Sequence, residues 1–281
     1  MSRPWAGIGP SPKIWLPRPP WCAPAICWRP SRRPSAHSTE GSPTLRFLDA
    51  VKGKLIISCQ AQKGEPLHGP EHMAAMARAA EMAGAAAIRA ESPDDIRAIK
   101  AAVAIPVLGL WKQKDLPGLW STITPTWKAV QEVANAGADA IAIEGTSNPR
   151  PDGQTLATTL VLVHLEIGKP IVADISTVDE GLSAAHNGAN AVATTLSGYT
   201  LQSGGHRDTP DYDLLDALVA KCPVPVILEG HVWTPEQAAE GLRRGAHAVV
   251  VGSAITRPQL IGKRFVEAIA AALPVAAPGG P

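Results

Sequence analysis

The chain of 281 residues has few cysteines, little excess charge and no long apolar run, and each shortage excludes a class of protein. Its four cysteines are too few and too scattered for a disulfide scaffold, and no second Cys/His pair completes a zinc pattern. A formal net charge of +1 argues against a nucleic-acid-binding protein. No uninterrupted apolar run reaches the roughly 18 residues of a membrane span. We therefore expect a cytoplasmic protein without nucleic-acid or membrane partners.

The first 45 residues differ in composition from the rest of the chain. They hold ten of the 27 prolines and four of the eight tryptophans, and show neither helical nor alternating periodicity. Prolines block helix interiors and central strands, so we expect residues 1–45 to be a disordered extension outside the fold. A non-functional segment from a wrongly assigned start fits best; an Arg-rich transit peptide and a proline-rich interaction arm remain alternatives.

Eight short apolar runs follow, and they predict buried parallel strands. Their lengths and β-branched content are typical of such strands, and their starts lie 21 to 34 residues apart, enough for a helix and two loops. The runs are Leu55–Cys59, Ala85–Arg89, Pro106–Trp111, Ala140–Glu144, Pro170–Asp174, Ala191–Leu196, Pro225–Glu229 and Ala248–Gly252.

A Gly-Ala pair precedes every second run, at Gly84, Gly137, Gly188 and Gly245. Glycine there supplies the left-handed residue that ends a helix. Segments with apolar residues at helical spacing lie between the runs, and Arg46–Val51 predicts a short helix that closes the bottom of a barrel. A doubly wound sheet would also alternate strands and helices, but eight evenly spaced units favour one (β/α)8 barrel over residues 46–275, with a flexible tail at 276–281.

Polar residues follow the predicted strands where such barrels place their active sites. Arg89 and Lys112 are cations, whereas Glu144, Asp174 and Glu229 are carboxylates, a mixture that suits proton transfer at a polar substrate. No histidine ends a strand, so the ligand ring of a metal-dependent barrel epimerase is missing, and His231 alone is more typical of a loop residue. The other candidate substrate-binding residues are Gln60, Thr195, Ser197 and Tyr199.

The turns after the last two runs have the sequence features of a phosphate-binding site. Gly230, Gly252 and Ser253 make small, tight turns whose backbone amides can bind an anion, and Arg257 follows as a charged clamp. Ordinary βα turns would look similar, so the phosphate site is a hypothesis.

Taken in order, these segments resemble the bacterial N-acetylmannosamine-6-phosphate 2-epimerases over about residues 46–272. The most specific strings are T-T-L-S-G-Y-T at 194–200 and V-G-S-A-I-T-R-P at 251–258. The others are I-I-S-C-Q at 56–60, A-I-R at 87–89, G-L-W-K at 109–112, I-T-P-T at 123–126, A-D-I-S-T at 173–177 and L-E-G at 228–230.

The resemblance implies that the chain interconverts N-acetylmannosamine 6-phosphate and N-acetylglucosamine 6-phosphate in sialic acid breakdown, without a metal or organic cofactor. It implies that Lys112 transfers the proton, that Glu229 is the essential carboxylate, and that Gln60 and Arg89 bind substrate. The family's acidic residue after the fourth strand is normally aspartate, whereas here it is Glu144. That extra methylene leaves the substrate contacts of Glu144 open.

Two other functions fit parts of the pattern. A Schiff-base aldolase could use Lys112, and a non-catalytic phosphosugar-binding protein would need only the anion site. In each case the partner is a small phosphosugar. The sequence leaves the oligomeric state open, a homodimer included.

Overall fold

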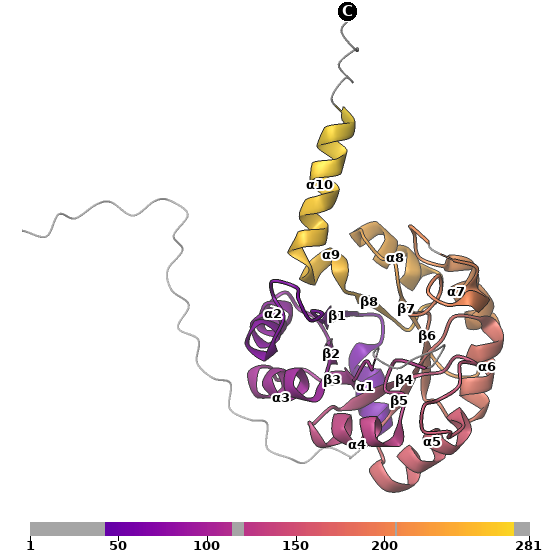
Figure 1. Cartoon of the computed structure of the whole chain (residues 1–281). Coiled ribbons are helices and arrows are strands. Elements are labelled where there is room, and N and C mark those ends of the chain that lie inside the picture. Colours follow the sequence, from indigo (N-terminus) through magenta and orange to yellow (C-terminus); the bar gives the residue numbers. More distant parts are fainter. Residues whose placement is uncertain (1–42, 114–120, 206, 273–281) are drawn as a thin grey trace, which may run out of the picture. The chain divides into compact units, whose positions relative to one another are not determined.

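The described residues form a closed barrel of eight parallel strands in the order β1 to β8 (Figure 1). The computed structural model describes residues 43–113, 121–205 and 207–272. The predicted (β/α)8 fold is therefore confirmed. The strands are β1 Leu55–Cys59, β2 Ala87–Glu91, β3 Val107–Leu110, β4 Ala140–Glu144, β5 Ile171–Asp174, β6 Ala191–Ala193, β7 Val226–Glu229 and β8 Ala248–Val251.

Helices alternate with the strands, as the βα repeat requires. They are α1 Pro43–Val51, α2 Pro70–Met82, α3 Pro93–Ala102, α4 Trp127–Asn135, α5 Leu156–Leu162, α6 Val178–His186, α7 Tyr212–Lys221, α8 Pro235–Arg243, α9 Ser253–Thr256 and α10 Pro258–Ala272. A π-helical turn, Val163–Ile167, continues α5, and a 3₁₀ turn covers Leu201–Ser203. None of the described helices is both long and apolar enough to cross a membrane.

The predicted end segments fall largely outside the described residues. Of the predicted extension, residues 1–42 lie outside, and so does the predicted tail at 276–281. Helix α1 begins at Pro43, three residues before the predicted start of the barrel at residue 46. Its Phe47 and Val51 are buried with the side chains inside the barrel, as expected of a helix that closes the bottom.

The four Gly-Ala pairs end helices as predicted. Gly84, Gly137, Gly188 and Gly245 all have positive φ angles, between 90° and 102°. After Gly84 and Gly245, the amide of the following alanine bonds back to a carbonyl in the last turn of the helix. This geometry satisfies terminal carbonyl groups while turning the chain into the next strand.

Strand β2 lies two residues later than the sequence predicted. We expected Ala85–Arg89, but the strand is Ala87–Glu91, because Ala85 still belongs to the turn that ends α2. Ser92 then caps α3 by accepting a hydrogen bond from the amide of Asp95. The strand therefore ends at Glu91 and not at Arg89.

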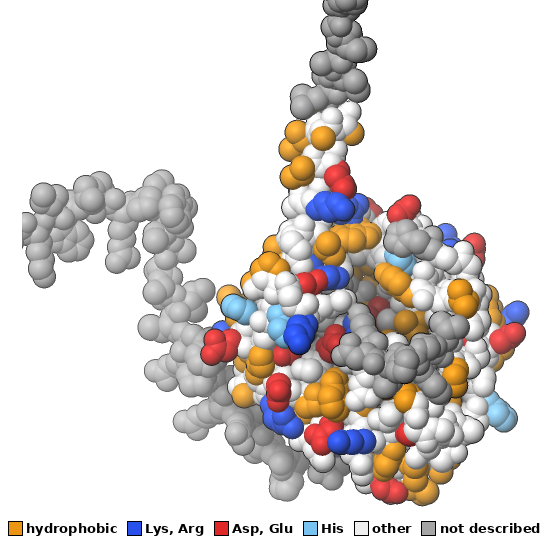
Figure 2. Space-filling view, in the orientation of Figure 1, with side chains coloured by type: hydrophobic (Ala, Val, Ile, Leu, Met, Phe, Trp, Pro, Cys, Tyr) orange, Lys and Arg blue, Asp and Glu red, His pale blue; other side chains and the backbone are white. Residues whose placement is uncertain are grey.

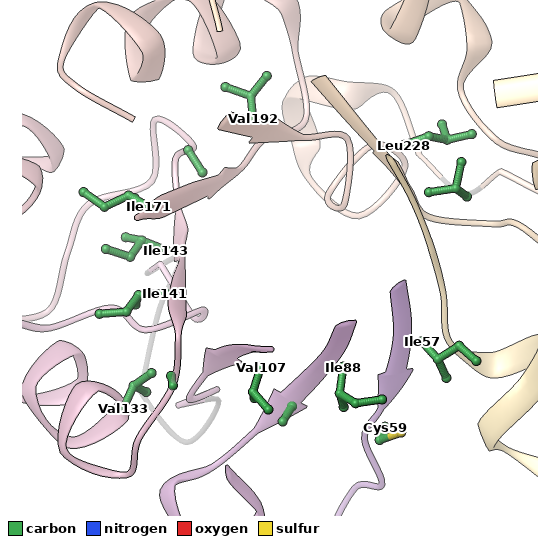
Figure 3. Packing of buried hydrophobic residues seen from close by; sticks show 14 of the residues in the cluster. Ile57, Cys59, Ile88, Val107, Val133, Ile141, Ile143, Ile171, Val192 and Leu228 are labelled. Carbon is green, nitrogen blue, oxygen red and sulfur yellow. The ribbon is translucent and has the colours of Figure 1, made fainter. Parts of the chain in front are cut away.

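The core has two layers separated by the strands. Alternate strand residues point into the barrel or out toward the helices. Ile56, for example, lies in the inner cluster, whereas Ile57 lies in the outer one. Figure 3 shows members of the outer cluster, among them Ile57, Ile141 and Leu228, on the side of the strands away from the barrel interior.

Cys59 belongs to this outer layer. Its side chain is fully buried, and burial raises the pKa of its thiol to about 12. Reactive cysteines require an accessible thiolate, so Cys59 contributes packing and not chemistry.

Candidate functional site

A cavity of about 1080 Å³ opens where the strands end at their carboxyl side. Ten of the predicted site residues line it: Gln60, Arg89, Lys112, Thr195, Tyr199, Glu229, Gly230, Gly252, Ser253 and Arg257. The barrel thus brings together side chains that lie almost 200 residues apart in the chain. No group of three or more His, Cys, Asp or Glu side chains suited to a metal ion occurs among the residues that the structure describes.

Arg89 links two carboxylates at the floor of this cavity. Its two terminal nitrogens donate to Asp174 at 3.1 and 2.7 Å, and its Nε lies 3.1 Å from Oε1 of Glu229. Arg89 is only 1% exposed. Burial works against its charge, but Asp174 and Glu229 outweigh this effect and raise the pKa of Arg89. Arg89 is therefore a fixed cation whose charge is largely balanced by its partners.

The side chain of Glu229 is 12% exposed, and one of its carboxylate oxygens has no hydrogen-bond donor among the described residues. Its Oε2 is buried and accepts no hydrogen bond from the described residues. Burial raises the pKa of Glu229 to about 7, an effect that Arg89 opposes and Asp174 reinforces. A carboxyl group with a pKa near neutrality can both accept and donate a proton under physiological conditions.

The backbone around Glu229 is held by the preceding unit. The hydroxyl of Thr194 donates to the carbonyl of Glu229 at 2.8 Å and accepts from its amide at 3.0 Å. Thr195 donates its hydroxyl proton to Asp174 at 2.5 Å. The threonine pair after β6 therefore orients both acidic partners of Arg89.

Lys112 lies across the barrel from Glu229, since it follows β3 and Glu229 ends β7. Its Nζ donates to Oε1 of Gln60 at 2.6 Å and lies 3.3 Å from Oε2 of Glu91. Gln60 is in turn oriented by a 2.8 Å hydrogen bond to the hydroxyl of Ser58. The ammonium group is thus held on the cavity wall between an amide and a carboxylate.

Glu91 is a site residue that sequence reasoning missed. It lines the cavity beside Lys112, yet we expected β2 to end at Arg89. The signal was present in Ser92-Pro93, because a serine followed by proline is typical of a helix start and limits the strand to residues before it.

The turns after β7 and β8 form one end of the cavity. Gly230, Gly252 and Ser253 line it, and a Cβ at Gly252 would lie 3.3 Å from the Cβ of Ser58, closer than most such contacts. Arg257 also lines the cavity and forms an ion pair with Glu65. The sequence predicted an anion site from these backbone groups and this guanidinium, and anion binding there stays a prediction.

An aromatic pair borders the cavity at Tyr199 and His231. Their rings stack with centroids 4.8 Å apart and planes inclined by 13°. His231 adopts a left-handed backbone conformation with φ of 56°, which is uncommon for residues other than glycine, although histidine adopts it more often than most. The ring of His231 also contacts the carbonyl of Ser197 at 3.2 Å through Nε2. This histidine, expected to be a loop residue, is held in the cavity wall.

Three of the predicted substrate-binding residues do not line the cavity. Asp174 is fully buried and bound to Arg89 and Thr195. Ser197 is 2% exposed and donates to Asp211 at 2.5 Å. Glu144 is also 2% exposed, and its carboxylate accepts hydrogen bonds from two neighbouring loops. Each of them supports other parts of the site, and a direct substrate contact for them stays a prediction.

Sequence comparisons match the chain to a family model and to relatives that are named for the same activity. A family model described as "Putative N-acetylmannosamine-6-phosphate epimerase" matches residues 73–271. A relative of that name from Caldanaerobacter subterraneus subsp. tengcongensis is 48% identical over 224 residues, covering 79% of this chain and 94% of that protein. Another relative, from Cutibacterium acnes, is 46% identical over 231 residues, covering 80% of this chain and 98% of that protein.

A solved structure agrees with the sequence matches. The N-acetylmannosamine-6-phosphate 2-epimerase from Clostridium perfringens superposes with a TM-score of 0.77 at 41% identity. The superposition covers 83% of this chain and 99% of the Clostridium chain. The similarity therefore extends over the whole barrel.

Proposed function

Because this chain belongs to the N-acetylmannosamine-6-phosphate 2-epimerase family and is an isomerase, we propose that it inverts C2 of N-acetylmannosamine 6-phosphate by proton transfer at Lys112. The product is N-acetylglucosamine 6-phosphate. One observation carries the proposal: Lys112 and Glu229 line the same cavity from opposite sides of the barrel, and Glu229 keeps a buried oxygen without a partner among the described residues.

The reaction needs a base that removes the C2 proton and returns it on the other face. Lys112 is that base in our proposal, and it must be neutral when it takes the proton. Glu229 binds a substrate hydroxyl through its available oxygen and assists the proton transfer. Arg89 is bound to two carboxylates, so besides contacting the substrate it holds Glu229 in place.

The experiment that tests this function is proton NMR of the purified protein with N-acetylmannosamine 6-phosphate in heavy water. We expect conversion to N-acetylglucosamine 6-phosphate with deuterium at C2. Borohydride added with substrate should leave the protein unmodified, since the proposed reaction forms no Schiff base. A trapped lysine adduct would favour an aldolase, and binding without turnover would favour a silent phosphosugar-binding protein.

The substrate indicates where the enzyme works. A phosphorylated sugar does not cross a membrane unaided, so we place the enzyme in the cytoplasm. Because the chain belongs to this epimerase family, we place its reaction in the breakdown of sialic acids. The substrate-contacting residues in this proposal are the cavity-lining Gln60, Arg89, Thr195, Tyr199 and Glu229.

We propose that the phosphate binds to the turns after β7 and β8, beside Arg257. The phosphate does not react, so its contacts should stabilise the bound substrate and the transition state equally. Arg257→Ala is therefore expected to raise KM roughly 10- to 100-fold, as for the loss of a hydrogen bond between charged groups, with little change in kcat. Steady-state kinetics measure both parameters.

Glu65→Ala is the matched control for this variant. It removes the ion pair with Arg257 but keeps the guanidinium, so KM should not rise. If Arg257→Ala leaves KM unchanged, the phosphate binds elsewhere.

We propose that the chain forms a homodimer through α10. This helix of 15 residues buries none of them, and Phe265, Val266 and Ile269 are 64% to 67% exposed. Figure 2 shows hydrophobic side chains along α10 open to solvent. Because a helix of this length with no fully buried residue is marginal in water, it gains stability when a second copy of the chain covers it.

Phe265→Asp is expected to convert the dimer to a monomer in sedimentation velocity. Leu165→Asp places the same charge on an exposed leucine of the π-helical turn, 77% exposed, and should leave the dimer intact. A wild-type protein that sediments as a monomer at micromolar concentration would refute the proposal.

A further inference from the structure

The carboxylate of Glu144 holds the loop that follows β3. Its Oε2 accepts hydrogen bonds from the amides of Thr122 and Ile123 at 2.6 and 3.1 Å, and from the hydroxyl of Thr122 at 3.2 Å. Its Oε1 accepts from the hydroxyl of Thr146 at 2.6 Å and from the amide group of Asn148 at 3.2 Å. Both oxygens are thus engaged by the protein itself.

The segment held by Glu144, residues 121–124, is the antiparallel partner of the residues around Lys112. Lys112 and Ile123 form an isolated β-bridge. The amide of Gln113 donates to the carbonyl of Thr122, and the amide of Thr124 donates to the carbonyl of Trp111, both at 2.9 Å. The position of the Lys112 backbone is therefore set by segment 121–124.

This segment contains a strained residue, which requires outside support. Thr124 is fully buried and has φ of 48°, a left-handed conformation that a β-branched side chain rarely adopts. Its hydroxyl donates to the carbonyl of Ala142 at 2.7 Å, and the amide of Trp111 donates to that hydroxyl at 3.1 Å.

A buried arginine, Arg150, binds both the end of β4 and segment 121–124. Arg150 is 5% exposed, and its guanidinium donates to the carbonyl of Glu144 at 3.1 Å and to that of Thr124 at 2.9 Å. The end of β4 and segment 121–124 are thus bonded through both the side chain and the backbone of Glu144.

We propose that Glu144 is a positioning residue for Lys112 and acts through segment 121–124. The carboxylate fixes the two amides of the segment, the segment fixes the backbone of Trp111–Gln113, and this sets where Nζ meets the substrate. Thr122 and Ile123 also line the cavity, so the same bonds shape the wall beside Lys112. The inference rests on the proposed role of Lys112 as the base.

Two variants of Glu144 separate positioning from substrate contact. Glu144→Ala frees the segment, and a misplacement near 1 Å costs about 10²-fold in rate, so kcat should fall by that order with KM nearly unchanged. In Glu144→Gln the amide oxygen can still accept from both backbone amides. Its NH₂ group can donate to the hydroxyl of Thr146 and, once the Asn148 amide rotates, to the side-chain oxygen of Asn148. Glu144→Gln should therefore keep kcat within about fivefold of wild type.

Glu180→Ala is the matched control. Glu180 is a buried carboxylate that accepts from the amides of Ser147, Ser176 and Thr177, on loops that do not carry Lys112. Its removal should lower Tm comparably to Glu144→Ala but leave kcat within about threefold, because only stability and not the base is affected.

A second readout does not depend on activity. Lysine amines are methylated reductively with ¹³C-formaldehyde, and the Lys112 resonance is assigned by its loss in Lys112→Arg. This resonance should shift in Glu144→Ala and remain in place in Glu144→Gln and Glu180→Ala. If the wild-type protein failed to epimerise, the proposed function would be wrong, while the resonance would still report whether Glu144 positions Lys112.

Three results would overturn the inference. In one, Glu144→Gln loses as much activity as Glu144→Ala, which would assign the effect to charge. In another, Glu144→Ala raises KM and spares kcat, which would indicate a substrate contact. The third is a Lys112 resonance that is unchanged in Glu144→Ala.

Discussion

Replacing Lys112 with alanine is expected to abolish both epimerisation and the exchange of the C2 proton with solvent. A single base that removes and returns this proton must pass it through an exchangeable amine, so both processes depend on the same group. Among the described residues that line the cavity, the only other lysine is Lys263 on α10. Proton NMR in heavy water follows conversion and deuterium incorporation in one experiment.

Lys263→Ala provides the matched control, because Lys263 also borders the cavity. It lies on α10, is 68% exposed and pairs with Glu267 at 3.5 Å, so it should not act as the base. We expect this variant to exchange the C2 proton at the wild-type rate. If Lys112→Ala exchanged it at that rate as well, the base would be another group and our site assignment would fail.

Glu229→Gln is expected to lower kcat/KM by roughly 10²- to 10⁴-fold, the usual cost of losing acid–base assistance. The substitution keeps the shape of the side chain but removes its ability to accept a proton, and it leaves Arg89 with one carboxylate partner fewer. Glu91→Gln alters the carboxylate beside Lys112 and should have a smaller effect, since Glu91 pairs with Lys112 whereas Glu229 pairs with Arg89. Equal losses in the two variants would contradict a special role for Glu229.

The raised pKa of Glu229 also predicts a pH-dependent stability difference. The pKa is about 7 in the fold against an ordinary value of 4.5, so the folded chain binds a proton that the unfolded chain releases. Glu229 therefore contributes stability that is present below pH 4.5 and is lost as the pH rises through 7. Tm of Glu229→Gln relative to wild type should increase between pH 5 and pH 8, as measured by calorimetry. A constant difference would mean that the pKa of Glu229 is not raised.

Local chemistry in the sequence predicted most of the barrel. Glycine ends helices because it adopts positive φ without strain, so the spacing of Gly84, Gly137, Gly188 and Gly245 reveals the repeat before any contact is known. Buried parallel strands need apolar residues on both faces, and this produces the eight runs. The cavity position of Lys112 and Glu229 follows from the same repeat, because active sites form where barrel strands end.

Strand boundaries depend on competing local signals, and here prediction was less accurate. The sequence at Ala85 and Ala86 is compatible with either a strand or a turn. In the structure the amide of Ala85 donates to the carbonyl of Ala80, so Ala85 belongs to the turn after α2. Because of this two-residue difference, Glu91 was not among the site residues predicted from the sequence, although Glu91 lies beside Lys112. Element ends are set by small energy differences between alternative hydrogen bonds, which composition does not resolve.

The sequence by itself determined the fold class, because the strand runs and helix ends follow from residue type and periodicity, and it indicated the family through the resemblance of its motifs. Only the tertiary structure decided which polar groups face the cavity. Glu144, Asp174 and Glu229 all end strands, yet Glu144 is bound by the amides of Thr122 and Ile123, and Asp174 by Arg89. A buried carboxylate turns toward whichever donors compensate its lost hydration, and those donors come from other parts of the chain.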